Sequence, residues 1–273
     1  MKRFQTRLVH VIGGFLLVAA NTFSTALRAE VPKVLQACGD ADEWPPFTYF
    51  ERSLGKKTNA VSGYNVDYLT ALLAESGRTA VFTLLPWKRC LERAKHGEFD
   101  IVLDGSKTPI REKDFLFPES HYQLTPIILY RKDWVKPDLS RPEVRSSLNV
   151  CGQLGYAYDR KNTPFENVQI QTPARTFTSV VMMLKHGRCD LVLFNFEIVT
   201  GYAKTGGLNI FQDKSLVHAL LDSPSMPLYL MVSRNSPFRT ELVDLLNKGI
   251  VALNKSGAAR KLYDQHIKLQ KPQ

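Results

Sequence analysis

The chain has 273 residues, 44% of them hydrophobic, and 36 Lys and Arg against 26 Asp and Glu give a formal charge of +10. Basic and acidic residues alternate along the chain and do not form one basic stripe, so we expect no nucleic-acid partner. After the N-terminal region, no segment is long and apolar enough to suggest a membrane span.

Residues 1–29 have the features of a secretory signal peptide. Three basic residues precede an apolar run at 8–20, and small residues follow up to Ala29. The run is shorter than the roughly 20 residues that a membrane span needs, and a retained membrane anchor is the alternative. We predict cleavage after Ala29, with a cut after Ala26 as a second choice. Cleavage after Ala29 removes four basic residues and no acidic ones, so the remaining 244 residues carry +6.

Four cysteines follow this segment: Cys38, Cys90, Cys151 and Cys189. An even number in an exported chain favours disulfides, with free buried thiols as the alternative. Zinc is disfavoured because the sequence has no CxxC and no closely spaced Cys–His pair. Three pairings are possible; if the chain forms two lobes, the pairing that lets each lobe fold alone joins Cys38 to Cys90 and Cys151 to Cys189.

The first half of the mature chain alternates strand and helix patterns. A strand is predicted at 33–37, and the turn-rich stretch GDADEWPPF follows. Residues 62–77 predict a helix with a serine cap, one apolar face and a glycine stop. A strand at 79–85, a helix opened by Pro86 and a strand ending at Leu103 complete this half. Strands that alternate with helices imply a parallel sheet.

The second half repeats this plan between two extended segments. The extended stretch at 122–130 leads to a Pro- and Arg-rich connection, a strand at 148–151 and a helix around 176–185. A second extended segment at 224–232 precedes helices at 239–253 and 256–266. We expect the chain to cross to a second lobe near Arg131, to return near Ser225, and to finish on the first lobe.

One motif occurs in both halves. The run KHGEFDIVL ends at Leu103, and KHGRCDLVL ends at Leu193, ninety residues later. Each copy predicts the end of a helix, a glycine stop and a buried strand. In open parallel sheets, ligands bind beyond the carboxyl ends of the strands, so we expect residues 104–106 and 194–196 to face each other across a cleft.

The order of motifs resembles the extracytoplasmic solute-binding proteins of family 3, the polar amino-acid binders of ABC transporters. The motifs that carry the resemblance are PPF at 45–47, GYNVDYL at 63–69, GEFDIVLDGSKTPIRE at 97–112, GYAY at 155–158 and RCDLVLFN at 188–195. Each motif alone is weak, whereas five in this order cover nearly the whole mature chain.

The resemblance implies a two-lobed α/β fold of the periplasmic-binding-protein (Venus-flytrap) type, with a mainly parallel sheet in each lobe and two crossing hinge strands. Lobe 1 is expected at 30–130 and 226–273, and lobe 2 at 131–225. The implied protein is periplasmic and monomeric, closes on a small polar solute with a carboxylate, and delivers it to an ABC permease. No cofactor or metal is implied.

The resemblance also assigns site residues in lobe 1. Arg111, three positions after Thr108, is expected to hold the ligand's carboxylate, and Ser106 to hydrogen-bond to it. The alternative for Arg111 is a surface pair with Glu112 or Asp114. Trp44 and Trp87 are expected to place their rings around the ligand, with core packing as the alternative.

In lobe 2, the resemblance assigns Gly155, Tyr156 and Asn195. Backbone amides at the first two can receive carboxylate oxygens. Members that bind α-amino acids usually have an aspartate where this chain has Asn195, and an amide offers the ligand's ammonium only a neutral acceptor. Either another acid replaces this aspartate or the ligand is not a standard α-amino acid; the candidate acids are Glu197, Asp104, Asp42 and Glu43.

We interpret the chain as a binding protein and not as an enzyme. The sequence contains no GxSxG, HExxH, phosphate-loop or GxGxxG pattern. The alternative is a periplasmic enzyme on the same fold, similar to cyclohexadienyl dehydratases, with Glu43 or Asp104 as its general acid. A variant of the main hypothesis hands the closed form to a receptor and not to a permease.

Overall fold

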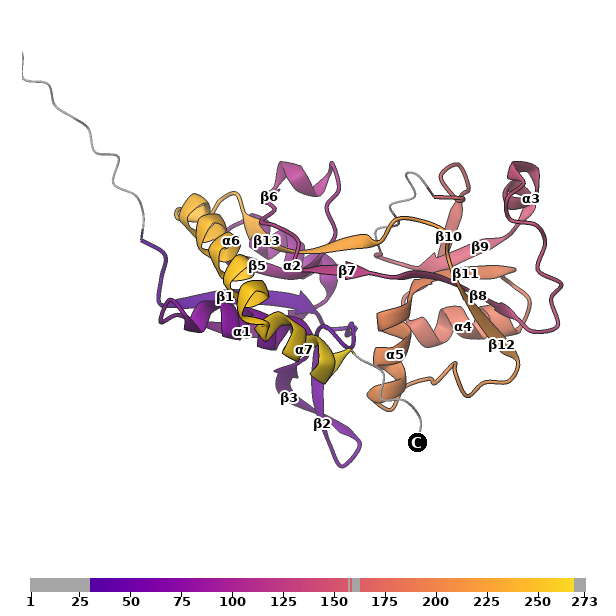
Figure 1. Cartoon of the computed structure of the whole chain (residues 1–273), viewed down its shortest axis with the longest axis horizontal. Coiled ribbons are helices and arrows are strands. Elements are labelled where there is room, and N and C mark those ends of the chain that lie inside the picture. The colour runs from indigo at the N-terminus through magenta and orange to yellow at the C-terminus, as the bar shows by residue number, and fades with distance from the viewer. Residues whose placement is uncertain (1–29, 157, 159–162, 268–273) are drawn as a thin grey trace, which may run out of the picture.

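The computed structural model describes residues 30–156, 158 and 163–267 of the chain. The predicted signal peptide at 1–29 lies outside the described residues, and so does Ala157 of the GYAY motif. The described chain forms two lobes that lie side by side (Figure 1). Each lobe contains one large sheet flanked by helices.

The sheet of lobe 1 has the order β4-β1-β5-β13-β6, and β7 pairs with β13. Strands β1, β4 and β5 are parallel, whereas β13 runs antiparallel to β5. Its strands are β1 (Val34–Asp40), β4 (Thr79–Leu85), β5 (Ile101–Gly105), β6 (Phe115–Leu116), β7 (Tyr122–Leu124) and β13 (Met226–Ser233). Its helices are α1 (Tyr64–Ala74), α2 (Trp87–Lys95), α6 (Arg239–Ser256) and α7 (Ala258–His266).

Helices cover both faces of this sheet because its strands are apolar on both sides. Leu35 of β1 packs into the core on the side of α1 and α6, whereas Cys38 of the same strand packs with α2 on the other side. Successive strand residues point to opposite faces, so a strand covered on both faces is apolar throughout. This arrangement leaves the strand ends and the loops after them as the exposed functional edge.

The sheet of lobe 2 has the order β10-β9-β11-β8-β12. Strands β9, β10 and β11 are parallel, and β8 runs antiparallel to both β11 and β12. Its strands are β8 (Pro126–Arg131), β9 (Val150–Gln153), β10 (Ile170–Ala174), β11 (Leu191–Asn195) and β12 (Leu216–Leu220). Its helices are α3 (Pro142–Ser147), α4 (Phe177–Lys185) and α5 (Phe196–Lys204).

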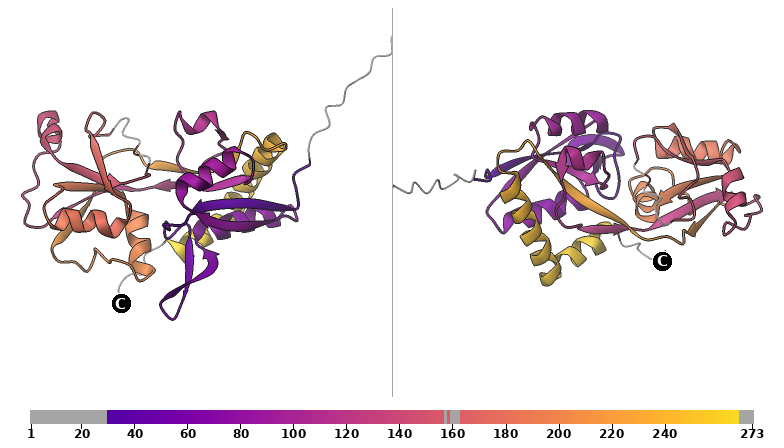
Figure 2. Two further views of the ribbon diagram at one scale, coloured as in Figure 1. Left: turned by 180° about the vertical axis from the view of Figure 1, so that it is seen from behind. Right: turned by 90° about the horizontal axis from the view of Figure 1, so that it is seen from above.

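Two extended segments connect the lobes, as predicted. Strands β7 and β8 form the outward segment and β13 the return, and β7 and β13 pair antiparallel (Figures 1 and 2). Because a returning strand runs against the one that left, the sheets contain antiparallel as well as parallel strands. Strand β8 joins the second sheet from Pro126 onward, and the lobe ranges 30–130 with 226–273 and 131–225 stay a prediction.

The repeated motif forms the same helix end, glycine turn and strand start in both lobes. Helices α2 and α4 end at Lys95 and Lys185, and Gly97 and Gly187 follow with positive φ angles of 82° and 70°. The aspartate of each motif copy then accepts a hydrogen bond from a backbone N–H: Asp100 from Gln36, and Asp190 from Asn149. The repeat therefore fixes where each buried strand enters its sheet.

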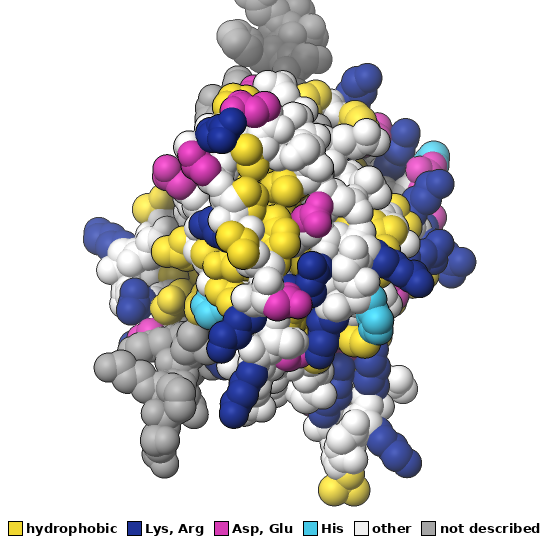
Figure 3. All heavy atoms as spheres, turned by 90° about the vertical axis from the view of Figure 1, so that its right-hand side faces the viewer, with side chains coloured by type: hydrophobic (Ala, Val, Ile, Leu, Met, Phe, Trp, Pro, Cys, Tyr) yellow, Lys and Arg dark blue, Asp and Glu magenta, His cyan; other side chains and the backbone are white. Residues whose placement is uncertain are grey.

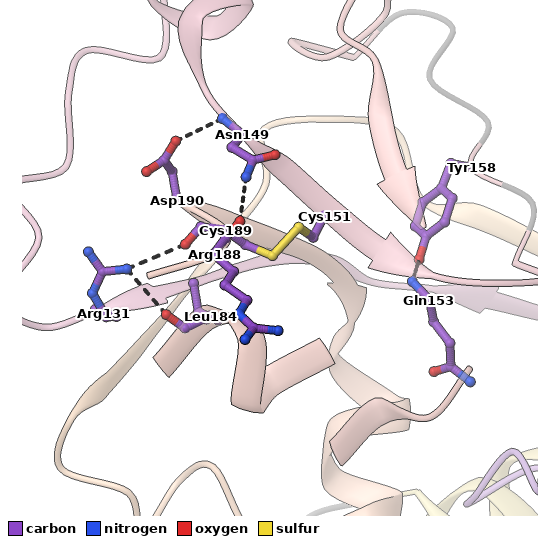
Figure 4. The surroundings of a disulfide bond; sticks show 9 residues. All are labelled: Arg131, Asn149, Cys151, Gln153, Tyr158, Leu184, Arg188, Cys189 and Asp190. Atoms are coloured by element: carbon purple, nitrogen blue, oxygen red, sulfur yellow. Dashed lines mark hydrogen bonds between the residues drawn. A yellow bond between two sulfur atoms is a disulfide. The ribbon is translucent and has the colours of Figure 1, made fainter. Parts of the chain in front are cut away.

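Each lobe contains one disulfide, and the predicted pairing is confirmed. Cys38 is joined to Cys90, and Cys151 to Cys189. The second bridge ties β9 to the turn before β11, beside the carbonyls of Leu184 and Cys189, which accept from Arg131 (Figure 4). Each bridge thus links the parallel strand beside the repeat strand, β1 or β9, to the helix or turn that leads into the repeat strand.

The predicted serine cap of the first helix is wrong. Ser62 ends a strand, and α1 begins at Tyr64 after Gly63, whose φ is 127°. A Cβ at Gly63 would lie 2.3 Å from the carbonyl oxygen of Phe47, so the close approach of this loop needs glycine. The motif GYN thus begins with the one residue type that lets the loop after β1 pack on the helix start.

The sequence did not predict the hairpin of β2 (Tyr49–Ser53) and β3 (Lys56–Ser62), which projects from lobe 1 with Leu54 at its tip. On the face of lobe 2 shown in Figure 3, hydrophobic side chains gather near the centre, and Lys and Arg lie among Asp and Glu. Within the described residues, every helix is too short or too polar to pass through a membrane.

Candidate functional site

A cavity of about 380 Å³ lies where residues from the two sheets meet. All seven predicted site residues line it: Trp44, Trp87, Ser106, Arg111, Gly155, Tyr156 and Asn195. A second cavity of about 290 Å³ shares Ser106, Tyr156, Asn195 and Met226 with the first. Of the residues expected to face the cleft, Asp104, Ser106 and Asn195 line the first cavity and Phe194 lines the second, whereas Gly105 and Phe196 line neither.

Arg111 is held at the cleft by the loop that follows β5. Its Nη1 donates to the carbonyl oxygen of Ser106 at 2.9 Å, and its backbone N–H donates to Thr108 Oγ1 at 3.3 Å. The guanidinium also lies 5.2 Å from the ring of Trp87, a cation–π arrangement. Burial lowers the pKa of Arg111, but a guanidinium stays charged in proteins. The loop thus fixes a cation in the cleft.

The acidic neighbours of Arg111 in the sequence pair with other residues. Glu112 pairs with Lys107 at 3.1 Å, and Asp114 pairs with Lys95 at 3.4 Å. Among the described residues, no carboxylate forms an ion pair with Arg111. The alternative of a surface pair with Glu112 or Asp114 is therefore wrong, and the guanidinium is available to a ligand.

Aromatic rings from both lobes form the walls of the cleft. Trp44, after β1, lies 5.9 Å from Tyr156 of lobe 2 between ring centroids, in an edge-on arrangement. Trp44 also packs 5.0 Å from Phe47, and Trp87 packs against the core on the α2 side of the sheet. Each tryptophan packs against the core and also lines the cavity, so the predicted contact of its ring with a ligand stays a prediction.

The lobe 2 edge of the cleft is uncharged where the two predicted motifs end. Gly155 has a φ of 90°, in the region that favours glycine, and turns the chain after β9 toward Tyr156. Asn195 ends β11 with 6% of its surface exposed, and its Oδ1 has no hydrogen-bond donor among the described residues. Burial raises the pKa of the Tyr156 hydroxyl far above its usual value.

Asp104 brings a carboxylate to the lobe 1 edge. It is the fourth residue of β5, with a φ of 61°, a conformation that aspartate tolerates better than most residues. Thr48 Oγ1 donates to its Oδ1 at 3.0 Å, and Asn65 Nδ2 donates to the same oxygen. Burial raises the pKa of Asp104 to about 7, in spite of these two hydrogen bonds.

The other acids that the sequence offered are already engaged or exposed. Glu197 accepts from the backbone N–H and the hydroxyl of Thr125 and from the hydroxyl of Tyr122. Glu43 pairs with Arg52 and Lys57 of the hairpin. Asp42 lines the cavity but is exposed to solvent. Of the four candidates, Asp104 alone places a buried, unpaired oxygen in the cleft, within the described part of the chain.

Sequence reasoning missed several residues of the cleft wall. Asp40 at the end of β1, Lys88 in the first turn of α2 and Arg175 after β10 line the cavity. Asp40 and Lys88 are neighbours of predicted residues, so the same strand-end rule could have found them. Arg175 follows a strand that the sequence did not predict, so no sequence feature indicated that it lines the cavity. The described residues contain no group of His, Cys, Asp and Glu that could hold a metal ion.

Known proteins resemble this chain over nearly its whole length. The family model for bacterial extracellular solute-binding proteins, family 3, matches residues 37–269. The ABC transporter arginine-binding protein 1 of Escherichia coli (strain K12) is 23% identical over 254 residues, which cover 91% of this chain and 95% of that protein.

Solved structures share the fold at lower identity. A putative binding component of an ABC transporter from Wolinella succinogenes DSM 1740, complexed with lysine, has a TM-score of 0.69 at 18% identity and covers 88% of this chain and 98% of its own. The ancestral amino acid-binding protein AncCDT-1, a precursor of cyclohexadienyl dehydratase, has a TM-score of 0.65 at 22% identity, with 86% and 96% covered. These likenesses confirm the predicted two-lobed fold.

Proposed function

The chain belongs to the bacterial extracellular solute-binding proteins of family 3, and from this premise we propose that it captures a small carboxylate-bearing solute between its lobes. The solute is an amino acid or a derivative, and an ABC permease receives it. The arginine-binding protein of Escherichia coli and the lysine complex from Wolinella succinogenes support this class of solute.

The observation that carries the proposal is that Arg111 is held in the cavity without a carboxylate partner. Its guanidinium lines the cavity, donates a hydrogen bond to the carbonyl oxygen of Ser106 and lies against the Trp87 ring. Its backbone N–H is held by Thr108, and no described carboxylate pairs with the guanidinium. A planar guanidinium and a carboxylate form two parallel hydrogen bonds, which select geometry as well as charge. A neutralising anion is therefore what this position can recognise.

Contacts across the cleft support a closing mechanism. The hydroxyl of Tyr202 in lobe 2 donates to the carbonyl oxygen of Glu43 in lobe 1 at 3.2 Å, and Trp44 lies against Tyr156. A solute that touches both edges stabilises the closed state by its additional contacts, and a permease can then select that state. We propose a monomer that acts in the periplasm after signal-peptide cleavage.

A thermal-shift screen of the mature protein tests the proposal. Amino acids, polyamines, small carboxylates and peptides are added one at a time, with Arg111→Ala measured beside the wild type. Binding to the folded state raises the melting temperature by mass action. We expect a carboxylate-bearing solute to shift the wild type and not the variant. An equal shift of both proteins, or no shift by any carboxylate, would contradict the proposal.

An enzyme on the same fold is the second candidate, and Asp104 is the observation that favours it. A carboxyl group with a pKa of about 7 in a cleft is suited to general acid catalysis near neutral pH. AncCDT-1, which shares this fold, is an amino acid-binding protein and a precursor of cyclohexadienyl dehydratase, so the fold is compatible with both functions. Incubation with prephenate or arogenate separates the two functions, since an enzyme forms product at substoichiometric protein concentration and a binding protein does not.

A further inference from the structure

The second cavity, of about 290 Å³, lies beside the cavity that Arg111 lines and against the segments that connect the lobes. Its wall includes Pro126 and Ile127, where β8 begins, and Pro227 near the start of β13. Four residues belong to the walls of both cavities: Ser106, Tyr156, Asn195 and Met226. Because the cavities adjoin at these residues, one solute of sufficient length can occupy both.

The two cavities differ in charge. Six charged residues line the first: Asp40, Asp42, Lys88, Asp104, Arg111 and Arg175. Among the described residues, Lys107 is the one charged residue in the wall of the second, and it pairs with Glu112 at 3.1 Å. A charge that leaves water needs a partner, so the charged end of a solute belongs in the first cavity and an uncharged part suits the second.

Apolar side chains form much of the wall of the second cavity. They come from β8, β11, the loop after β12 and the start of β13: Ile127, Leu193, Phe194, Leu221 and Met226. The first three are buried in the sheet of lobe 2. The volume exceeds the roughly 150 Å³ of an engineered apolar cavity that binds benzene. The second cavity therefore has the room and the chemistry for a hydrocarbon group as large as an aromatic ring.

Aromatic rings give the lobe 2 side of this cavity a fixed shape. Tyr158 lies 6.2 Å from Tyr156 between ring centroids, and Tyr156 lies 6.0 Å from Phe194. The backbone N–H of Gln153 donates to the Tyr158 hydroxyl at 2.5 Å, so β9 holds this ring in place (Figure 4). A wall that is held before the ligand arrives loses little freedom on binding, which favours affinity.

One buried hydroxyl adds a polar point to this wall. Ser223 lines the second cavity, and its Oγ has no hydrogen-bond partner among the described residues. A hydroxyl can donate or accept, so it suits a neutral polar group such as an amide. The second cavity thus fits an uncharged group that is mainly apolar and can include an amide.

We propose that the second cavity holds an uncharged, mainly apolar extension of the solute, whose carboxylate lies on Arg111 in the first cavity. This inference rests on the proposed function and names the class of solute: carboxylates with an extended acyl or aromatic group, such as N-acylated amino acids. A compound that has the carboxylate end alone leaves the second cavity unfilled and binds more weakly.

Titration calorimetry of the mature protein with N-acetyl-, N-butanoyl-, N-hexanoyl- and N-octanoylglycine tests the proposal. The four compounds share the carboxylate and the amide and differ only in the length of the acyl chain. Each buried methylene strengthens binding about fourfold. We expect the affinity of the wild type to rise at least tenfold along the series, and Arg111→Ala to weaken every member by the same factor.

A substitution that fills the second cavity shows where the chain binds. Leu221 lines the second cavity and not the first, so Leu221→Trp reduces the space for the extension alone. Leu220→Trp is the matched control, because this neighbouring side chain is 72% exposed and lines neither cavity. We expect Leu221→Trp to bind N-acetylglycine within threefold of the wild type and the longest chains at least tenfold more weakly. Leu220→Trp should bind the whole series as the wild type does.

Circular dichroism and the melting temperature show which variants are folded. If Leu221→Trp does not fold, Leu221→Gln decides, since it keeps the size of the side chain and makes the wall polar; a gain with chain length equal to that of the wild type then overturns the extension. A wild-type affinity that does not change with chain length, or a gain that folded Leu221→Trp and Leu220→Trp share, also overturns it.

The same measurements separate this inference from the proposed function. If free amino acids bind and no N-acylglycine does, the extension is wrong and the carboxylate-binding function stands. If no carboxylate binds at all, both proposals fail.

Discussion

Strands β5 and β11 occupy equivalent places in the two lobes, but they present different chemistry to the cleft. Strand β5 ends in Asp104 and Gly105 and leads to Ser106 and Arg111, so the lobe 1 edge carries charges of both signs. Strand β11 ends in Phe194 and Asn195 and leads directly into α5. Its edge offers an amide and the nearby Tyr156 ring.

This difference suggests a division of labour between lobes built on the same repeat. The repeat sets the position of each strand by the same aspartate hydrogen bond, and the residues after the strand are free to differ. We expect lobe 1 to recognise charge and lobe 2 to cover the solute, since the one charged residue that lobe 2 adds to the described lining of this cavity is the exposed Arg175. Electrostatic interactions strengthen when water is excluded, so closure reinforces what lobe 1 binds.

The claim that the two lobes have equivalent scaffolds is tested by removing one disulfide at a time. The bridges close loops with sequence separations of 52 and 38 residues. Chain entropy then assigns each about 4 kcal/mol of the free energy of unfolding. We expect Cys38→Ser/Cys90→Ser and Cys151→Ser/Cys189→Ser to lose similar stability in urea unfolding. A loss confined to one pair would break the equivalence of the lobes.

The claim that lobe 1 carries the charged groups predicts that the free energy of unfolding depends on pH through Asp104 of lobe 1. In the ligand-free protein the pKa of Asp104 is about 7, against 3.8 for an unperturbed carboxyl, so the folded state keeps this proton as the pH rises from 4 to 7. The group's contribution is full below pH 4 and is lost toward pH 7, by an amount on the order of 2–4 kcal/mol.

Asp104→Asn lacks this contribution, so the difference in free energy of unfolding between wild type and variant should shrink as the pH rises through this range. Asp40 faces Asp104 from β1 and is present in both proteins. His121, behind Asn65, has a pKa lowered by burial to about 3, against 6.5 for an unperturbed histidine, so it changes the stability of both proteins within this window. Because His121 is present in wild type and variant alike, its contribution cancels in their difference. A difference that is constant from pH 4 to pH 7 would contradict the burial of the Asp104 charge.

A matched pair of arginines compares the two edges directly. Arg111 lies on lobe 1 and is half-buried, whereas Arg175 lines the cavity from lobe 2 and is exposed. Loss of one partner from a buried charge pair costs about 2 kcal/mol or more, and loss of an exposed charge costs less than about 1 kcal/mol. We expect Arg111→Ala to weaken binding of the solute found in the screen at least thirtyfold and Arg175→Ala less than fivefold. Titration calorimetry measures the two affinities. Equal losses of affinity in the two variants would mean that Arg175 of lobe 2 binds the carboxylate as well, which would contradict the prediction.

Two helical glycines separate closure from stability. A Cβ at Gly201 of α5 would lie 2.2 Å from the carbonyl carbon of Pro45 in lobe 1, and a Cβ at Gly249 of α6 would lie 2.4 Å from Leu72 Cγ within lobe 1. We expect Gly201→Ala to hold the lobes apart and weaken solute binding by about 1 kcal/mol, roughly fivefold. Gly249→Ala should instead lower the melting temperature, since overpacking a core costs about 1–3 kcal/mol. Weakened binding in both would argue against the contact between lobes.

The sequence predicted most of the elements with strong periodic patterns. The strand at 79–85 matches β4, and the helices at 176–185 and 239–253 match α4 and α6 within three residues. The hairpin of β2 and β3 escaped prediction because its strands are largely exposed and polar, so they lack the alternation that marks a half-buried strand. Helix α5 escaped because it follows β11 without a turn and begins with no side-chain cap.

Site residues were predictable where their place in the chain is enough to put them in the cleft, since the ends of the repeat strands and the loops after them line it. Which acid keeps an unpaired oxygen was not predictable. Glu197 is turned to Thr125 and Tyr122, 72 and 75 residues away in the sequence, and Glu43 is turned to the cations of a hairpin that the sequence did not predict. Such pairings depend on tertiary geometry, and the sequence therefore left four acids open.

A crystal structure of the protein with the solute of largest thermal shift tests the central claim most directly. We predict that the carboxylate contacts the Arg111 guanidinium. The lobe 2 groups, Tyr156 and Asn195, should cover the solute without supplying an ion pair. A carboxylate bound to Arg175 or to the Gly155 turn, away from Arg111, would contradict the assignment of charge recognition to lobe 1.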